Sequence, residues 1–175
     1  GEYIINAGHG PRHERATAEG VTVTAGETTA LTLELAEVIP RDGWLAMDSH
    51  IHGAPSFDGA LPMEDRLVAC AATGVQLPLV TDHDVLVDYG PLLRALGLAE
   101  RAWTVPGVEL TTMIRGHFDL FPVAPDPAQP NGGAIPWWLE SLDTPALFER
   151  MRGLIGEAGL LQVNHPRTPG MVAFA

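Results

Sequence analysis

Five of the seven histidines in this chain of 175 residues stand at the ends of short apolar segments that read as strands. In α/β sheets and barrels, the strand ends that meet at one edge carry the ligand-binding residues. A single histidine at such a place is usually structural, but five at equivalent places predict a cluster of imidazoles around bound metal. The five are His50, His52, His83, His117 and His165.

Two of these histidines, His50 and His52, lie two residues apart, so a strand would point both imidazoles to one face and toward one cation. Two carboxylates accompany them. Asp58 stands in a turn that a structural Asp-Gly pair would also explain, and Glu109 lies near the end of an apolar segment. A carboxylate such as Glu109 can bridge two cations, which a neutral imidazole cannot do.

The predicted ligands mix nitrogen and oxygen atoms, and this set suits Zn²⁺, Mn²⁺ or Fe²⁺ better than Ca²⁺ or Mg²⁺. The ligands outnumber those that one tetrahedral ion needs, so we expect two or three divalent ions. Clustered cations lower the pKa of bound water toward ~7 and supply hydroxide without a serine or cysteine nucleophile. The predicted set is His50, His52, Asp58, His83, Glu109, His117 and His165.

Five further charged residues lie close to these ligands in the sequence. Arg115 and Arg167 could hold an anionic group of a substrate, although a solvated arginine is an equally good interpretation. Asp48, Asp82 and Asp84 flank histidines, and a carboxylate in such a place can orient a metal-bound imidazole through its second nitrogen.

From residue 44 onward the pattern alternates between strand and helix, which predicts a parallel α/β sheet or barrel. The helix expected to begin near Thr144 would have this threonine as its N-cap and proline in its first turn. The expected strands cover residues 75–81, 102–110, 117–123 and 160–164, and the expected helices cover 62–72, 91–98 and 144–157.

The first forty residues differ from the rest, because their apolar and β-branched residues alternate between glycines. We expect strands over 3–5, 20–24 and 29–35, and interpret residues 1–40 as the end of a β-rich, sandwich-like module. Residues 41–175 would then form the metal-binding domain. The chain starts with neither methionine nor a signal peptide, so we expect its natural start to be missing. A cytoplasmic and an exported location both remain open.

The composition excludes several classes of protein. The chain is 46% hydrophobic and 18% charged, as globular proteins are. Its formal charge of −12 argues against binding to a nucleic-acid backbone. No apolar run reaches the ~18 residues of a membrane span. All ten basic residues are arginine, so a carboxylated lysine cannot bridge metals within this segment.

In order and spacing, the motifs around the seven predicted ligands resemble the polymerase and histidinol phosphatase (PHP) family, from about residue 44 onward. The carbaryl-hydrolase-like (CehA/McbA) branch is the most similar. The resemblance implies a distorted (β/α)7 barrel, preceded by β-strands and incomplete at its C-terminal end. It also implies three metal sites, held by His50, His52 and Glu109, by Glu109, His117 and His165, and by Asp58 and His83.

The family's last motif, Asp-x-His, has no counterpart here, so we expect the remaining barrel segment in missing sequence or in a separate chain. The resemblance implies a phosphoesterase with a small phosphorylated ester as substrate. A carbamate or carboxyl ester on the same site is the alternative. An amidohydrolase barrel also begins with His-x-His, but it often needs the lysine that this chain lacks. A non-catalytic binding module with a degenerate site is the third reading.

Overall fold

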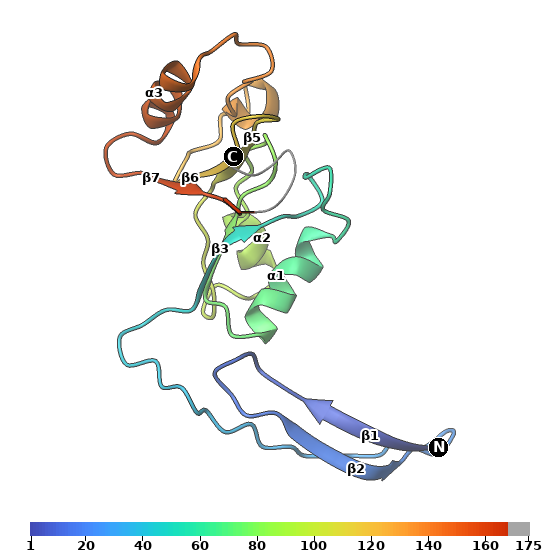
Figure 1. Cartoon of the computed structure of the whole chain (residues 1–175). Coiled ribbons are helices and arrows are strands. Elements are labelled where there is room, and N and C mark those ends of the chain that lie inside the picture. The colour runs from blue at the N-terminus through green and yellow to red at the C-terminus, as the bar shows by residue number, and fades with distance from the viewer. Residues whose placement is uncertain (168–175) are drawn as a thin grey trace.

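A computed structural model describes residues 1–167, which form seven short strands, three α-helices and one 3-10 helix. Three small sheets and the helices follow one another from the N-terminal end to the C-terminal end of the molecule (Figure 1). The elements are β1 (Glu2–Ala7), β2 (Ala16–Thr22), β3 (Met47–Ile51), α1 (Met63–Ala72), β4 (Leu77–Val80), α2 (Gly90–Ala95), β5 (Val108–Thr111), β6 (His117–Phe121), η1 (Pro130–Gly133), α3 (Thr144–Ile155) and β7 (Leu160–Val163).

The N-terminal hairpin pairs β1 with β2 in antiparallel register, as the alternating sequence predicts. It lies at one end of the molecule, away from the other two sheets (Figure 1). The third strand expected over residues 29–35 does not form, because that segment makes no ladder with its neighbours. Instead, Glu37 joins the hairpin loop through a bridge to His13 and an ion pair with Arg12.

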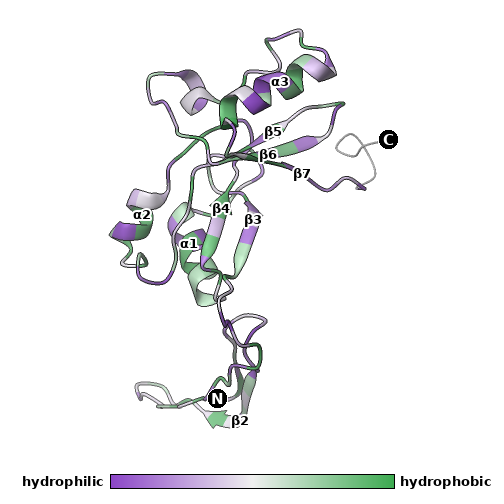
Figure 2. Ribbon diagram, turned by 90° about the vertical axis from the view of Figure 1, so that its left-hand side faces the viewer, coloured by the Kyte–Doolittle hydropathy of each residue, from purple (hydrophilic) through white to green (hydrophobic). Residues whose placement is uncertain are grey.

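The second sheet pairs β3 with β4 in parallel, and α1 forms the connection between them. Met63 and Leu67 of α1 are buried in one cluster with Val80 of β4, so the helix covers this sheet. In Figure 2 the two strands lie side by side, with hydrophobic residues over most of β4 and hydrophilic residues in the middle of β3. The expected buried parallel strand over 75–81 is thereby confirmed.

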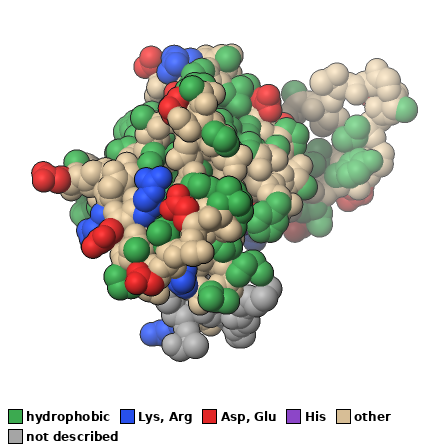
Figure 3. All heavy atoms as spheres, turned by 90° about the horizontal axis from the view of Figure 1, so that it is seen from above, with side chains coloured by type: hydrophobic (Ala, Val, Ile, Leu, Met, Phe, Trp, Pro, Cys, Tyr) green, Lys and Arg blue, Asp and Glu red, His purple; other side chains and the backbone are tan. Residues whose placement is uncertain are grey.

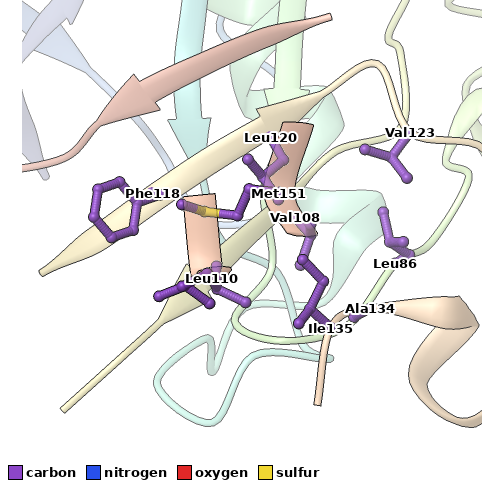
Figure 4. Packing of buried hydrophobic residues seen from close by; sticks show 10 residues of the cluster. Leu86, Val108, Leu110, Phe118, Leu120, Val123, Ala134, Ile135 and Met151 are labelled. Atoms are coloured by element: carbon purple, nitrogen blue, oxygen red, sulfur yellow. The ribbon is translucent and has the colours of Figure 1, made fainter. Parts of the chain in front are cut away.

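The third sheet has the order β5-β6-β7 and is antiparallel throughout. Met151 of α3 is fully buried and lies near Leu110 and Leu120 of the sheet (Figure 4). The helix starts one residue earlier than a Thr144 cap predicts, because Asp143 is the N-cap and its side chain accepts a hydrogen bond from the backbone N–H of Ala146. This acidic cap satisfies one of the free N–H groups of the first turn.

The predicted (β/α)7 barrel is wrong. The described residues contain three separate sheets of two, two and three strands, and only β3 and β4 are connected by a helix in the way a barrel requires. A parallel crossover needs a dozen or more residues, and residues 112–116 are too few to carry β6 back beside β5 in parallel. The end of the predicted second segment, residues 168–175, lies outside the described residues.

The described helices include none that is long and apolar enough to cross a membrane. On the face seen in Figure 3, arginine side chains are scattered and have acidic side chains near them.

Candidate metal centre

All seven predicted ligands line one cavity of about 380 Å³ at the junction of the second and third sheets. The strands explain this convergence. His50 lies in β3 with His52 just after it, Glu109 lies in β5, and His117 begins β6. His83 follows β4 and His165 follows β7, so both stand at strand ends, as the sequence indicates. The remaining residues that line the cavity are Asp58 and Phe57.

Glu109 is the centre of this arrangement, with an exposed fraction of 0%. Its Oε1 lies 3.0 Å from His117 Nδ1 and 3.3 Å from His165 Nε2. On the other side, Oε2 lies 2.8 Å from His83 Nδ1 and 3.4 Å from His52 Nε2. His50 Nε2 is 3.5 Å from Oε1. Five imidazoles therefore surround one buried carboxylate.

The donor atoms form three overlapping groups, and within each group the atoms lie within 4.8 Å of one another. Nitrogen and oxygen ligands stand about 2.0–2.2 Å from a zinc ion, so atoms this close together can share one. The chain thus carries buried His, Glu and Asp clusters that could form a metal site. The groups are His50, His52 and Glu109; His52, Asp58 and His83; and His83, Glu109 and His117.

The residues present fit a cation in two further ways. Glu109 Oε2 and His165 Nδ1 are buried and make no hydrogen bond of standard geometry, although buried polar atoms are nearly always paired. His50 Nε2 also lies only 2.8 Å from His52 Nε2. Two nitrogen lone pairs this close repel each other unless a proton or a cation lies between them.

The close packing of the histidines around Glu109 also shifts the pKa values of these side chains. Burial alone would raise the pKa of Glu109, but the attraction of His50 and His83 and the hydrogen bond from Asn164 outweigh it and hold this pKa far below its usual range. Burial lowers the pKa of His50 and His83, yet the polar contact of each with the Glu109 carboxylate raises it above the ordinary value. For His52 and His117 burial prevails and their pKa values are lowered. The carboxylate is thus ionised, as a metal ligand must be.

Hydrogen bonds fix which nitrogen of His52 faces the cavity. Ser56 donates its hydroxyl proton to Asp82 Oδ1 at 2.9 Å, so at its 3.2 Å contact with His52 Nδ1 the Ser56 oxygen must accept. The proton of His52 is therefore on Nδ1, and the Nε2 lone pair is free to bind a cation. Asp82 itself does not reach the cavity. It is held by Gly53 N–H and the Tyr89 hydroxyl.

His83 is oriented in a similar way. Thr111 donates its hydroxyl to the carbonyl of Glu109 at 3.2 Å, so it accepts from His83 Nδ1 at 2.5 Å. The other nitrogen, His83 Nε2, lies 3.2 Å from Asp58 Oδ2. Asp58 is at the rim of the cavity with a half-exposed side chain. Phe57, with an exposed fraction of 81%, stacks on the ring of His83 with 4.4 Å between the centroids.

The other predicted site residues do not line the cavity. Asp48 is exposed and accepts the backbone N–H of His50 at 3.2 Å. Asp84 accepts from the backbone of Thr111 and from Trp137 Nε1 at 3.0 Å, so it fastens the long 124–143 loop beside the site. Burial raises the pKa of Asp84.

The two candidate substrate arginines also lie outside the cavity lining. Arg115 is half-buried in the turn between β5 and β6, where its backbone N–H donates to Thr112 Oγ1. Arg167 is exposed. Neither position supports a contact with a molecule in the cavity.

Several polar residues of the centre were missed by the sequence reasoning. The buried Asp119 accepts a hydrogen bond from the half-buried Gln162 behind His50, and Asn164 donates to Glu109 Oε1 at 3.1 Å. Asp119 lies two residues after His117 in β6, a period-two relation that could have drawn attention to it. Burial raises its pKa to about 7, against the opposing attraction of His50.

No family model, curated protein or solved structure matches this chain. Any assignment of function therefore rests on the geometry of the cavity and the chemistry of its side chains.

Proposed function

We propose that the protein is a metal-dependent hydrolase that cleaves a small phosphoric ester in the cavity around Glu109. The supporting observation is that five imidazoles lie within 3.5 Å of one fully buried carboxylate. One carboxylate balances a single positive charge, so it cannot accompany five protonated histidines. Divalent cations satisfy the lone pairs of neutral imidazoles and the charge of Glu109 together.

Two or three ions fit the three overlapping groups of donor atoms, with Glu109 shared between two of them. The nitrogen-rich set favours Zn²⁺, Mn²⁺ or Fe²⁺. When bound, such ions lower the pKa of water toward ~7 and neutralise the oxygens of a phosphoryl group. The choice of a phosphoric ester also follows the resemblance of the ligand set to the PHP family.

The chain's own side chains hold the ligands and shape the cavity. Ser56 and Thr111 keep the Nδ1 protons of His52 and His83 in place, which leaves each Nε2 as the free nitrogen. Among the described residues, those lining the cavity offer no hydroxyl or thiol as a nucleophile. Water is therefore the attacking group that this site favours.

A carbamate or carboxyl ester is the second candidate, and Phe57 favours it. This ring is largely exposed at the rim and stacked on His83, so it offers an apolar surface to a leaving group. An aryl leaving group could stack there, whereas a phosphoric ester of a small aliphatic alcohol would not use this surface.

The test uses the full chain, stripped with a chelator and reloaded separately with Zn²⁺, Mn²⁺ or Fe²⁺. Each form is assayed against p-nitrophenyl phosphate, a cyclic nucleotide, an aryl carbamate and a carboxyl ester. We expect metal-dependent hydrolysis of a phosphate ester. Glu109→Gln should lower it by on the order of 10²-fold or more, whereas the exposed control Glu157→Gln should not.

Preferential cleavage of the carbamate or carboxyl ester would show that the protein is a metal-dependent hydrolase whose substrate is not a phosphoric ester. Absence of metal-dependent turnover of all four compounds would contradict the proposal.

A further inference from the structure

Asp119 is a buried carboxylate that belongs to none of the three groups of donor atoms. Its exposed fraction is 0%, and its Oδ1 makes no hydrogen bond of standard geometry. Burying a carboxylate without full pairing costs free energy, so such a group needs a compensating partner. The histidine nitrogen that faces it is His50 Nδ1, which lies 3.6 Å from Asp119 Oδ2.

The position of Asp119 is fixed from β7. Gln162 uses its Nε2 to donate to Asp119 Oδ2 at 3.0 Å and to Asn164 Oδ1 at 2.9 Å. Its Oε1 accepts the hydroxyl of Ser49 at 2.9 Å, which settles the orientation of the amide. Asn164 continues the network to Glu109. Asp119 is thus held rigidly behind the centre by residues from β3 and β7.

The ring of His50 spans the gap between this network and the cavity. Its Nε2 faces His52 Nε2 and Glu109, whereas its Nδ1 faces Asp119. An imidazole binds a cation through one nitrogen only when its proton is on the other, and a carboxylate beside Nδ1 stabilises the proton there. At 3.6 Å the contact exceeds hydrogen-bond length, so Asp119 acts on His50 electrostatically at this separation.

We infer that Asp119 is a positioning residue that holds His50 in the Nδ1–H tautomer with Nε2 directed at the metal centre. The inference rests on the proposed metal centre, and it gives His50 the same kind of support that Ser56 gives His52. Loss of such an outer partner typically weakens metal binding by about 10–100-fold.

The test is a double-mutant cycle on zinc affinity, measured by calorimetric titration of the chelator-stripped full chain. Asp119→Asn keeps the shape of the side chain and removes its charge. We expect it to weaken zinc binding by about 10–100-fold in the unchanged background and to have almost no further effect in His50→Ala. A purely structural role would give the same loss in both backgrounds. Asp42→Asn, an exposed aspartate, is the matched control.

A second readout needs no variant at Asp119. Two-bond ¹H–¹⁵N NMR spectra of the zinc-loaded chain distinguish histidine tautomers, with the His50 signals assigned by their loss in His50→Ala. The expected state is protonated Nδ1, and protonated Nε2 would overturn the inference even if Asp119→Asn failed to fold. Equal loss of affinity in both backgrounds, or none in either, would also overturn it. An unchanged chain that binds no zinc would instead overturn the metal centre itself, and the inference with it.

Discussion

His83 and Glu109 are joined through both backbone and side chain. Their backbones form an isolated parallel bridge, and His83 Nδ1 lies 2.8 Å from Glu109 Oε2. Asp84 N–H donates to the carbonyl of Glu109, and Glu109 N–H donates to the carbonyl of Asp82. The candidate ligands therefore sit where the second sheet meets the third. Metal binding at the centre should therefore stabilise the contact between the two sheets, and removal of the metal should weaken it.

The metal-free protein should lose stability as pH rises above about 6.5. Burial raises the folded pKa of Asp119 to about 7, and the polar contacts of His50 and His83 with the Glu109 carboxylate overcome burial to raise their pKa values. A group with a raised folded pKa stabilises the folded chain at low pH, and this contribution is lost between its unfolded and its folded pKa. For Asp119 the loss takes place between the ordinary value of 3.8 and about 7, and for His50 and His83 it begins near 6.5. His52 and His117, with lowered pKa values, oppose this only below about 6.5.

The measurement is thermal unfolding of chelator-treated protein across this pH range, repeated with saturating zinc. Zinc should reverse the trend, because it binds deprotonated ligands. A melting temperature of the metal-free chain that rises with pH above 6.5 would contradict these charge states.

Removal of the Ser56 hydroxyl should weaken metal binding through His52. Ser56→Ala leaves His52 Nδ1 and one hydrogen bond of Asp82 without their partner, and buried groups left unpaired cost about 1–3 kcal/mol each. We expect lower zinc affinity and lower stability, measured by titration calorimetry and urea unfolding. Ser141→Ala, at an exposed serine, should change neither. Equal behaviour of the two variants would show that Ser56 does not orient His52.

The packing of α3 should matter for stability and not for metal binding directly. Met151 is fully buried against the third sheet, so Met151→Ala should lower the free energy of unfolding by about 2–5 kcal/mol. The half-exposed Met113 provides the control, and Met113→Ala should stay within about 0.5 kcal/mol. Urea unfolding measures both. A small effect of Met151→Ala would mean that α3 does not pack on the sheet as described.

The position of the long 124–143 loop beside the site should depend on one hydrogen bond donated by an indole N–H. Trp137 Nε1 donates to Asp84 Oδ1 at 3.0 Å, and Trp137→Phe removes this donor while keeping an aromatic ring. The expected loss is about 1.5–3 kcal/mol, the usual value for a bond to a charged group, with faster amide hydrogen exchange in the loop. Trp138→Phe is the paired control, since Trp138 is half-exposed. Equal exchange rates in the two variants would argue against this anchor.

The sequence predicts local features better than the arrangement of sheets. The helical spacing of residues 62–72 and the buried strand at 75–81 depend on neighbours in the chain, and both are found as α1 and β4. The barrel depended on parallel pairing throughout, yet β5, β6 and β7 pair antiparallel. Strand–helix alternation alone does not show which strands become partners, and the strand over 29–35 lacked a partner altogether.

In the candidate site, too, the features that depend on local sequence spacing could be predicted, and those that depend on distant residues could not. Because His50 and His52 are spaced by the period of a strand, and because the other ligands stand at strand ends, their convergence could be predicted. The role of Asp119 could not, since it depends on Gln162, which lies 43 residues away in the chain. Asp82 was expected to support a ligand, and it does so only through Ser56.

The most direct test of the metal centre is an anomalous-difference map from crystals of the zinc-saturated chain, recorded at the zinc absorption edge. The account predicts at least two peaks in the cavity, each about 2.0–2.2 Å from a histidine nitrogen or a carboxylate oxygen, with Glu109 bound to one or both. A cavity without a peak, or zinc found only at exposed side chains elsewhere, would contradict it.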